Sequence, residues 1–273
     1  MNAPDAGWTV PLPRPDHGPG DPPVSGPPPV VRPYRRRRWP RRLLLTAVAL
    51  VTAFAIGFAA LMLVTPSVGN AWSLARAQAA AHHERFPGPP VARKFSAALI
   101  ATEDHRFASE PGFDPFALPR IVASVLTGKD QGGATLYQQL AKLLYGARQV
   151  RLKTEIDEVA LGIKLKFSYS REQILQMYAD VAYFGNGYYG IAAASCGYFG
   201  RPASRLSWPQ SAVLAGLVQA PSAYDPLRHP GFARSREGHV LGRLVATGVL
   251  TQSQARTAFA VPMRRLLSAT RGC

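Results

Sequence analysis

Acidic residues are scarce in this chain of 273 residues, which has 16 Asp and Glu against 32 Lys and Arg. The formal net charge of +16 indicates an anionic partner, which is a nucleic acid, an anionic lipid or a phosphorylated substrate. Composition alone does not separate these three classes, so the position of the positive charge has to decide.

Cysteine is also scarce, with only Cys196 and Cys273. Two cysteines exclude a disulfide framework and form no metal-ligand pattern, and we do not expect them to pair with each other. The six histidines have no metal-site spacing either.

Strand signals are few after residue 92, whereas helix signals are frequent. Three pairs have the spacing of an N-terminal capping box, namely Ser170 with Gln173, Ser207 with Gln210 and Thr251 with Gln254. Gly248 is suited to end the helix before it. The sequence therefore predicts a mainly α domain over residues 93–273.

The first 42 residues contain about half of the 25 prolines and end in an arginine-rich stretch. Such a segment cannot bury enough apolar surface to fold, so we predict a disordered tail over residues 1–42.

Residues 43–64 form an apolar run without a charged residue, and a helix of this length spans about 30 Å of hydrocarbon. A cleaved signal peptide and a buried core helix are the alternatives, although a signal peptide has an apolar core of only about 7–15 residues. We predict a single transmembrane helix. The arginines before it place residues 1–42 in the cytoplasm and the chain after residue 64 outside. Residues 65–92 are predicted to be a juxtamembrane stalk.

The densest polar cluster of the external part is Glu103-Asp104-His105-Arg106, which follows an apolar helical stretch. Such a cluster is often only the solvated end of a helix. A second stretch, GGATLYQQLAK at residues 132–142, combines two glycines that allow a tight turn with two adjacent glutamines. Amide groups suit sugar hydroxyls, although a glutamine pair on its own is more often a polar helix face.

Five blocks in order, between about residues 95 and 263, resemble the peptidoglycan glycosyltransferases, glycosyltransferase family 51. This family includes monofunctional transglycosylases and the transglycosylase domains of penicillin-binding proteins. The blocks are Glu103-Asp104-His105-Arg106-Phe107 with Gly112 and Asp114; residues 132–142; the region of Glu158; residues 174–200; and residues 206–226. The resemblance implies a lysozyme-like helical domain with a membrane-facing apolar subdomain.

The resemblance also implies the reaction, in which a growing glycan chain leaves undecaprenyl pyrophosphate for the 4-hydroxyl of lipid II, with inversion to a β-1,4 bond. Glu103 would be the general base. Glu158 would lie near the leaving group and help to hold a divalent metal such as Mg²⁺. Residues that would bind the substrate are Asp104, Phe107, Thr135, Gln138, Gln139, Lys142, Arg151 and Lys153.

The expected partners are lipid II, the nascent glycan strand, the bilayer and other cell-wall synthesis proteins, with no nucleic acid. The acidic substrate would account for part of the surplus of positive charge, and the rest lies in the basic flank of the apolar run, where anionic lipids would attract it.

Several positions depart from the family pattern. The usual Arg-Lys pair before Glu158 is replaced by Thr154 and Glu155, and the nearby cations Arg151 and Lys153 would have to compensate. The other departures are Glu110 for His, Ala134 for Ser, Tyr137 for Thr, Asp180 for Asn and Gln210 for Glu.

Three functions follow from these patterns. The favoured one is a monofunctional transferase, since the chain ends soon after the fifth block and leaves no room for a transpeptidase domain. The departures favour a second function, a non-catalytic domain that binds lipid II or scaffolds a wall-synthesis complex. The third is a lytic enzyme that shares the lysozyme-like fold, which would need a glutamate but not the glutamine pair.

Overall fold

The computed structural model describes residues 26, 41–113, 134–146, 151–268 and 273, and these residues divide into two units, 1–51 and 52–273. Within the described ranges the chain is helical and contains no strand, only an isolated bridge between Tyr183 and Tyr189. The prediction of a mainly α protein is confirmed.

Helix α1, Arg41–Val64, contains the predicted apolar run. Residues Leu43–Val64 have a mean hydropathy of 2.5, and none of this stretch is buried inside the protein. Among the described helices it alone is long and apolar enough to cross a membrane.

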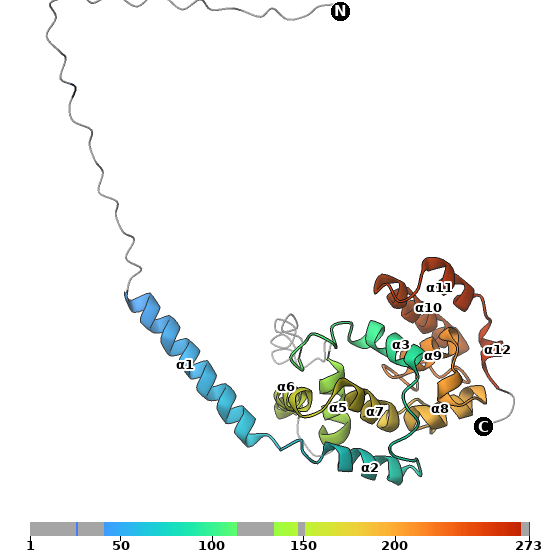
Figure 1. Ribbon diagram of the computed structural model, residues 1–273, viewed down its shortest axis with the longest axis horizontal. Helices are drawn as coiled ribbons and strands as arrows, with labels where there is room; N and C mark the ends of the chain where they lie inside the picture. The colour runs from blue at the N-terminus through green and yellow to red at the C-terminus, as the bar shows by residue number, and fades with distance from the viewer. Residues whose placement is uncertain (1–25, 27–40, 114–133, 147–150, 269–272) are drawn as a thin grey trace, which may run out of the picture. The chain divides into compact units, whose positions relative to one another are not determined.

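The second unit is built from helices that pack around one apolar core (Figure 1). They are α2 (Ala71–Ala81), α3 (Arg93–Glu103), α5 (Leu136–Tyr145), α6 (Arg151–Ser168), α7 (Arg171–Val181), α8 (Gly190–Phe199), η3 (Ala203–Arg205), α9 (Trp208–Leu217), α10 (Pro230–Ala246), α11 (Gln252–Phe259) and α12 (Met263–Leu266).

Helix α9 is the centre of one group of helices. Every residue from Pro209 to Leu217 is buried, and α9 packs against α3, α8, α10 and α11. Helix α10 also packs against α3, so that α3, α9 and α10 lie side by side (Figure 1). A helix that is apolar on all sides is stable only inside such a core.

Helices α5, α6 and α7 form the other group, together with α2. Residues Ala71, Ala75 and Ala79 of α2 are buried, and this helix packs against α5 and α7. The part of the predicted stalk that is helical is therefore integrated into the folded unit.

The three predicted capping boxes are all present, at the starts of α7, α9 and α11. Gly248 follows the end of α10 with a φ of 74°, a backbone conformation that glycine adopts without strain. These helix ends were therefore predictable from local sequence signals alone.

The expectation that the two cysteines do not pair is wrong. Cys196 and Cys273 form a disulfide with an S–S distance of 2.02 Å and Cα atoms 5.1 Å apart. The pair forms because the chain after α12 returns to α8, where the backbone N–H of Ser268 donates to the carbonyl of Tyr198 at 2.8 Å.

Candidate functional site

The carboxylate of Glu103 lies where three helices meet. Glu103 is the last residue of α3, and its Oε1 accepts a hydrogen bond from Nη2 of Arg236 on α10 at 2.8 Å. Its Oε2 accepts a longer contact, 3.5 Å, from Nε2 of Gln139 on α5. Both members of the Glu103–Arg236 ion pair are 12% exposed. Glu103 is therefore a largely buried, oriented carboxylate and not the solvated end of a helix.

Burial raises the pKa of the Glu103 carboxyl above its usual value, because the charged form loses contact with water. The positive charge of Arg236 and the hydrogen bonds from Gln139 and Arg236 oppose this shift but do not cancel it. A carboxylate whose pKa is raised in this way is a stronger base, which suits proton abstraction near neutral pH.

Gln139 is held by protein groups at both ends of its amide. Its Nε2 donates to the carbonyl of Ala134 at 3.2 Å, and its Oε1 accepts from the hydroxyl of Tyr178 at 2.8 Å. Burial raises the pKa of Tyr178 and keeps its hydroxyl protonated, so it remains a donor. The geometry thus fixes Gln139 beside Glu103.

Gln138 and Thr135 serve the start of α5. The Thr135 hydroxyl accepts from the backbone N–H of Gln138, and Oε1 of Gln138 accepts from the N–H of Thr135 at 2.9 Å. Both side chains are buried. In this arrangement the two residues form a capping box that positions Gln139 one residue further on.

Asp104 joins α3 to α5. Its Oδ2 accepts from the backbone N–H of Leu136, the first residue of α5, at 2.9 Å. This bond satisfies a donor that a helix start would otherwise leave without a partner. Burial raises the pKa of Asp104, against the effect of this hydrogen bond. Asp104 therefore fixes the start of α5 against the end of α3, and this positions Gln139 relative to Glu103.

Phe107 and Lys142 are two further residues that were predicted to bind the substrate. Phe107 is in the core and stacks on Tyr137 with ring centroids 4.8 Å apart. Tyr137, which replaces a threonine of the family pattern, fills the space against this ring. Lys142 is exposed on α5, one turn after Gln139, where residues three apart are neighbours.

Glu158 is on α6, which packs against α5, and its side chain is half-buried. Helix α6 approaches the first two motifs at Gly162, where an added Cβ would lie 2.7 Å from the carbonyl oxygen of Gly112. Glycine at both positions allows this contact. Helix α6 begins at Arg151, so Arg151, Lys153 and Glu158 share one helix. The side chains of Arg151 and Lys153 lie outside the described residues, as do Gly132, Gly133 and Asp114.

Magnesium fits this site only in part. Among the described residues, no group of three or more His, Cys, Asp or Glu side chains could hold a metal ion. Glu158 offers one carboxylate, which is enough for Mg²⁺ only when substrate phosphates and waters complete the coordination.

Arg236 was not predicted as a site residue from the sequence. It is 133 residues from Glu103, and only the packing of α10 on α3 brings the two side chains together. A signal was present in the spacing of Arg236 and Arg243, two turns apart on α10, next to a face of buried residues that includes Val240 and Leu244. Arg243 also reaches α3, because its Nε donates to the carbonyl of Ala101 at 3.1 Å.

An oriented, buried carboxylate with a paired cation and a glutamine amide is a site suited to acid–base chemistry on a polar substrate. The sequence profile described as "Transglycosylase" matches residues 72–245, so the chain belongs to the peptidoglycan transglycosylase family.

Relatives of known sequence agree with this assignment. Penicillin-binding protein 1A of Aquifex aeolicus is 38% identical over 168 residues, which are 61% of this chain and 23% of that protein. A Cupriavidus necator protein whose name assigns it to the transglycosylases is 32% identical over 175 residues, 64% of this chain and 76% of its own. The chain thus spans about a quarter of the length of the penicillin-binding protein.

The crystal structure of penicillin-binding protein 1A from Haemophilus influenzae matches half of this chain and 17% of its own, at 26% identity and a TM-score of 0.33.

Proposed function

We propose that this protein polymerises lipid II into β-1,4 glycan strands and releases undecaprenyl pyrophosphate. The observation that carries the proposal is the buried Glu103 carboxylate, held by Arg236 and Gln139. Each carboxylate oxygen has two lone pairs, so Glu103 retains the capacity to accept a proton from a sugar hydroxyl.

In the proposed reaction Glu103 removes the proton from the 4-hydroxyl of the incoming lipid II. The oxygen attacks the anomeric carbon of the growing chain from the face opposite the pyrophosphate. The bond to the pyrophosphate breaks and the configuration inverts. The positive charge of Arg236 favours the ionised form of the carboxylate, and its hydrogen bond holds the carboxylate in one orientation.

The pyrophosphate takes up negative charge as it leaves, and a cation there would lower the barrier. Arg151 is the proposed cation, because on a helix it is about 20° in azimuth from Glu158, whereas Lys153 is about 140° away. A Mg²⁺ ion bound by Glu158 and the phosphates would supply further positive charge.

Incubation of the purified full-length protein with lipid II, followed by gel separation of the products, tests the proposal. We expect polymer. Binding of lipid II without any polymer would favour a non-catalytic domain instead, for which the absence of cations at Thr154 and Glu155 is the supporting observation.

We further propose that α1 anchors the protein in the cytoplasmic membrane, with residues 1–42 inside and residues 65–273 outside. The arginines before α1 support this orientation. The disulfide between Cys196 and Cys273 supports it independently, because disulfides persist in oxidising compartments. Reporter fusions after residue 70 should be active outside, and activity only in the cytoplasm would contradict this topology.

A further inference from the structure

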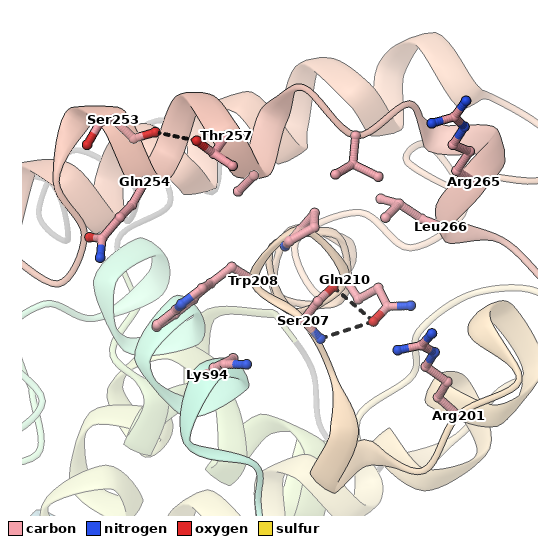
Figure 2. A pocket seen from close by; sticks show the side chains of 13 residues that line it. Lys94, Arg201, Ser207, Trp208, Gln210, Ser253, Gln254, Thr257, Arg265 and Leu266 are labelled. Carbon is pink, nitrogen blue, oxygen red and sulfur yellow. Dashed lines mark hydrogen bonds between the residues drawn. The ribbon is translucent and has the colours of Figure 1, made fainter.

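A hollow with a volume of about 600 Å³ lies beside Lys94, near the start of α3 (Figure 2). It is lined by parts of α3, α9, α11 and α12 and by Arg201, which follows α8. Lys94 is the second residue of α3 and Glu103 the last, so a rise of 1.5 Å per residue separates their Cα atoms by about 14 Å. This pocket is therefore distinct from the site around Glu103.

The pocket is rich in positive charge. None of its 13 lining residues, all within the described ranges, is acidic, and three are cations: Lys94, Arg201 and Arg265. In Figure 2, Arg201 and Arg265 lie at one side of the pocket, whereas Lys94 lies beside Trp208 at the other. The positive charge thus lies at two opposite sides of the pocket, with two arginines at one side and a lysine at the other.

Two hydrogen-bond acceptors in the lining of this pocket are already occupied by helix capping. Oε1 of Gln210 accepts from the backbone N–H of Ser207 at 3.0 Å and from its hydroxyl at 2.9 Å (Figure 2). Oε1 of Gln254 accepts from the backbone N–H of Thr251 at 2.8 Å. Both amide oxygens are consumed at helix starts, and each side chain retains its NH₂ group as a donor. The two glutamine side chains therefore offer the pocket donors and not acceptors.

Apolar side chains share the rest of the lining with the hydroxyls of Ser207, Ser253 and Thr257. The larger apolar residues are Trp208, Val261 and Leu266. A volume of this size is within the range of pockets that bind small molecules, about 300–1,000 Å³. The complementary ligand is short, includes apolar groups and carries acceptor-only anionic groups at separate places.

We propose that this pocket binds a short peptide that carries two separate carboxylates. Arginine forks bind carboxylates through two parallel hydrogen bonds, which suits Arg201 and Arg265. A single phosphate would instead favour cations that converge on one point. The source of the peptide rests on the proposed function, since the glycan strand carries peptides, but the pocket itself does not depend on that function.

Titration calorimetry with the full-length protein in neutral nanodiscs tests the proposal. The probes are the tripeptide Ala-Glu-Ala with an acetylated N-terminus, which has two carboxylates, and its neutral counterpart with Gln and a C-terminal amide. We expect the dianionic peptide to bind at least tenfold more tightly. Arg265→Gln and Arg201→Gln should each weaken its binding at least fivefold.

Arg264→Gln is the matched control, because Arg264 is exposed on the same helix but does not line the pocket. It should leave peptide affinity unchanged, and Glu103→Gln should do the same, which separates this proposal from the catalytic one. Equal affinity for the two peptides, or an equal loss in Arg264→Gln, would overturn the proposal. Tighter binding of inorganic phosphate or of anionic vesicles through Arg201 and Arg265 would also overturn it, in favour of a phosphate ligand.

Discussion

The charged side chains at the two ends of α3 differ in their burial and in their pairing. At the C-terminal end, the Glu103 carboxylate is 12% exposed and paired with Arg236 in a contact of 2.8 Å. At the N-terminal end, Lys94 is exposed and faces a pocket whose lining residues include no acid. One end thus holds a buried and paired carboxylate, whereas the other holds exposed positive charge beside a lining without acids.

This difference suggests that the helix carries two separate functions. A buried ion pair costs desolvation energy, and it is retained where orientation matters. Exposed cations cost little and are suited to attract a ligand in water. Changes at one end should therefore leave the other nearly unaffected.

The largest effect is expected from Glu103→Gln. The substitution keeps the shape of the side chain but removes its basicity, and a positioned base contributes about 10²–10⁴-fold to the rate. Polymerisation of lipid II should fall by this factor, while the protein should remain folded and peptide binding at the other end of α3 should stay nearly the same. A variant that polymerises at the rate of the parent would exclude Glu103 as the base.

Arg236→Gln should have the next largest effect. A hydrogen bond between charged groups contributes about 1.5–3 kcal/mol, which corresponds to a loss of roughly 10- to 100-fold in rate. Arg236 lowers the pKa of Glu103, so its removal raises that pKa further and less of the base is ionised at a given pH. The acidic limb of the pH–rate profile should therefore move to higher pH.

Arg243→Gln is the control for this shift. Arg243 donates to the backbone carbonyl of Ala101, whereas Arg236 donates to the carboxylate itself. The Arg243→Gln variant should show no shift of the acidic limb of the pH–rate profile, even where the substitution lowers the rate. An equal shift of the limb in both variants would show that Arg236 acts only through the position of α3.

Arg151→Ala tests the compensation for the missing Arg-Lys pair. We expect polymerisation to fall at least tenfold, because Arg151 is the cation on α6 closest in azimuth to Glu158. Lys153→Ala is the matched control and should have a much smaller effect. Equal small effects of both substitutions would remove the argument for compensation by this helix.

Local signals in the sequence were sufficient for much of the fold. The capping boxes at Ser170, Ser207 and Thr251 involve residues only three apart, so the chemistry of a helix start is visible without the tertiary structure. The apolar run of α1 is likewise a local feature. The motif around Glu103 also pointed to the residue that the packing buries and orients.

Contacts between distant parts of the chain were not predictable in this way. Arg236 reaches Glu103 across 133 residues, and Cys196 reaches Cys273 across 77. The role of Gln138 was also hidden, because two adjacent glutamines look equivalent in sequence. Only the position of Thr135 at the start of α5 directs Gln138 to the capping box and Gln139 to Glu103.

Removal of the disulfide is expected to have the smallest effect and to distinguish the functions proposed for the two ends of α3. It ties the chain after α12 to α8, near the end of the molecule where Arg265 lines the pocket. Cys273→Ser should cost about 2–4 kcal/mol of stability, because the unfolded chain regains the entropy of an open loop. The melting temperature should fall by roughly 4–16 °C at 2–4 °C per kcal/mol.

Peptide affinity should weaken in the same Cys273→Ser variant, since α12 loses an anchor, whereas polymerisation below the melting temperature should stay close to that of the parent. Reduction of the parent protein with a thiol should reproduce both effects. If the variant instead lost polymerisation as strongly as Arg236→Gln, the two ends of α3 would be coupled, and the division into a reaction site and a recognition site would fail.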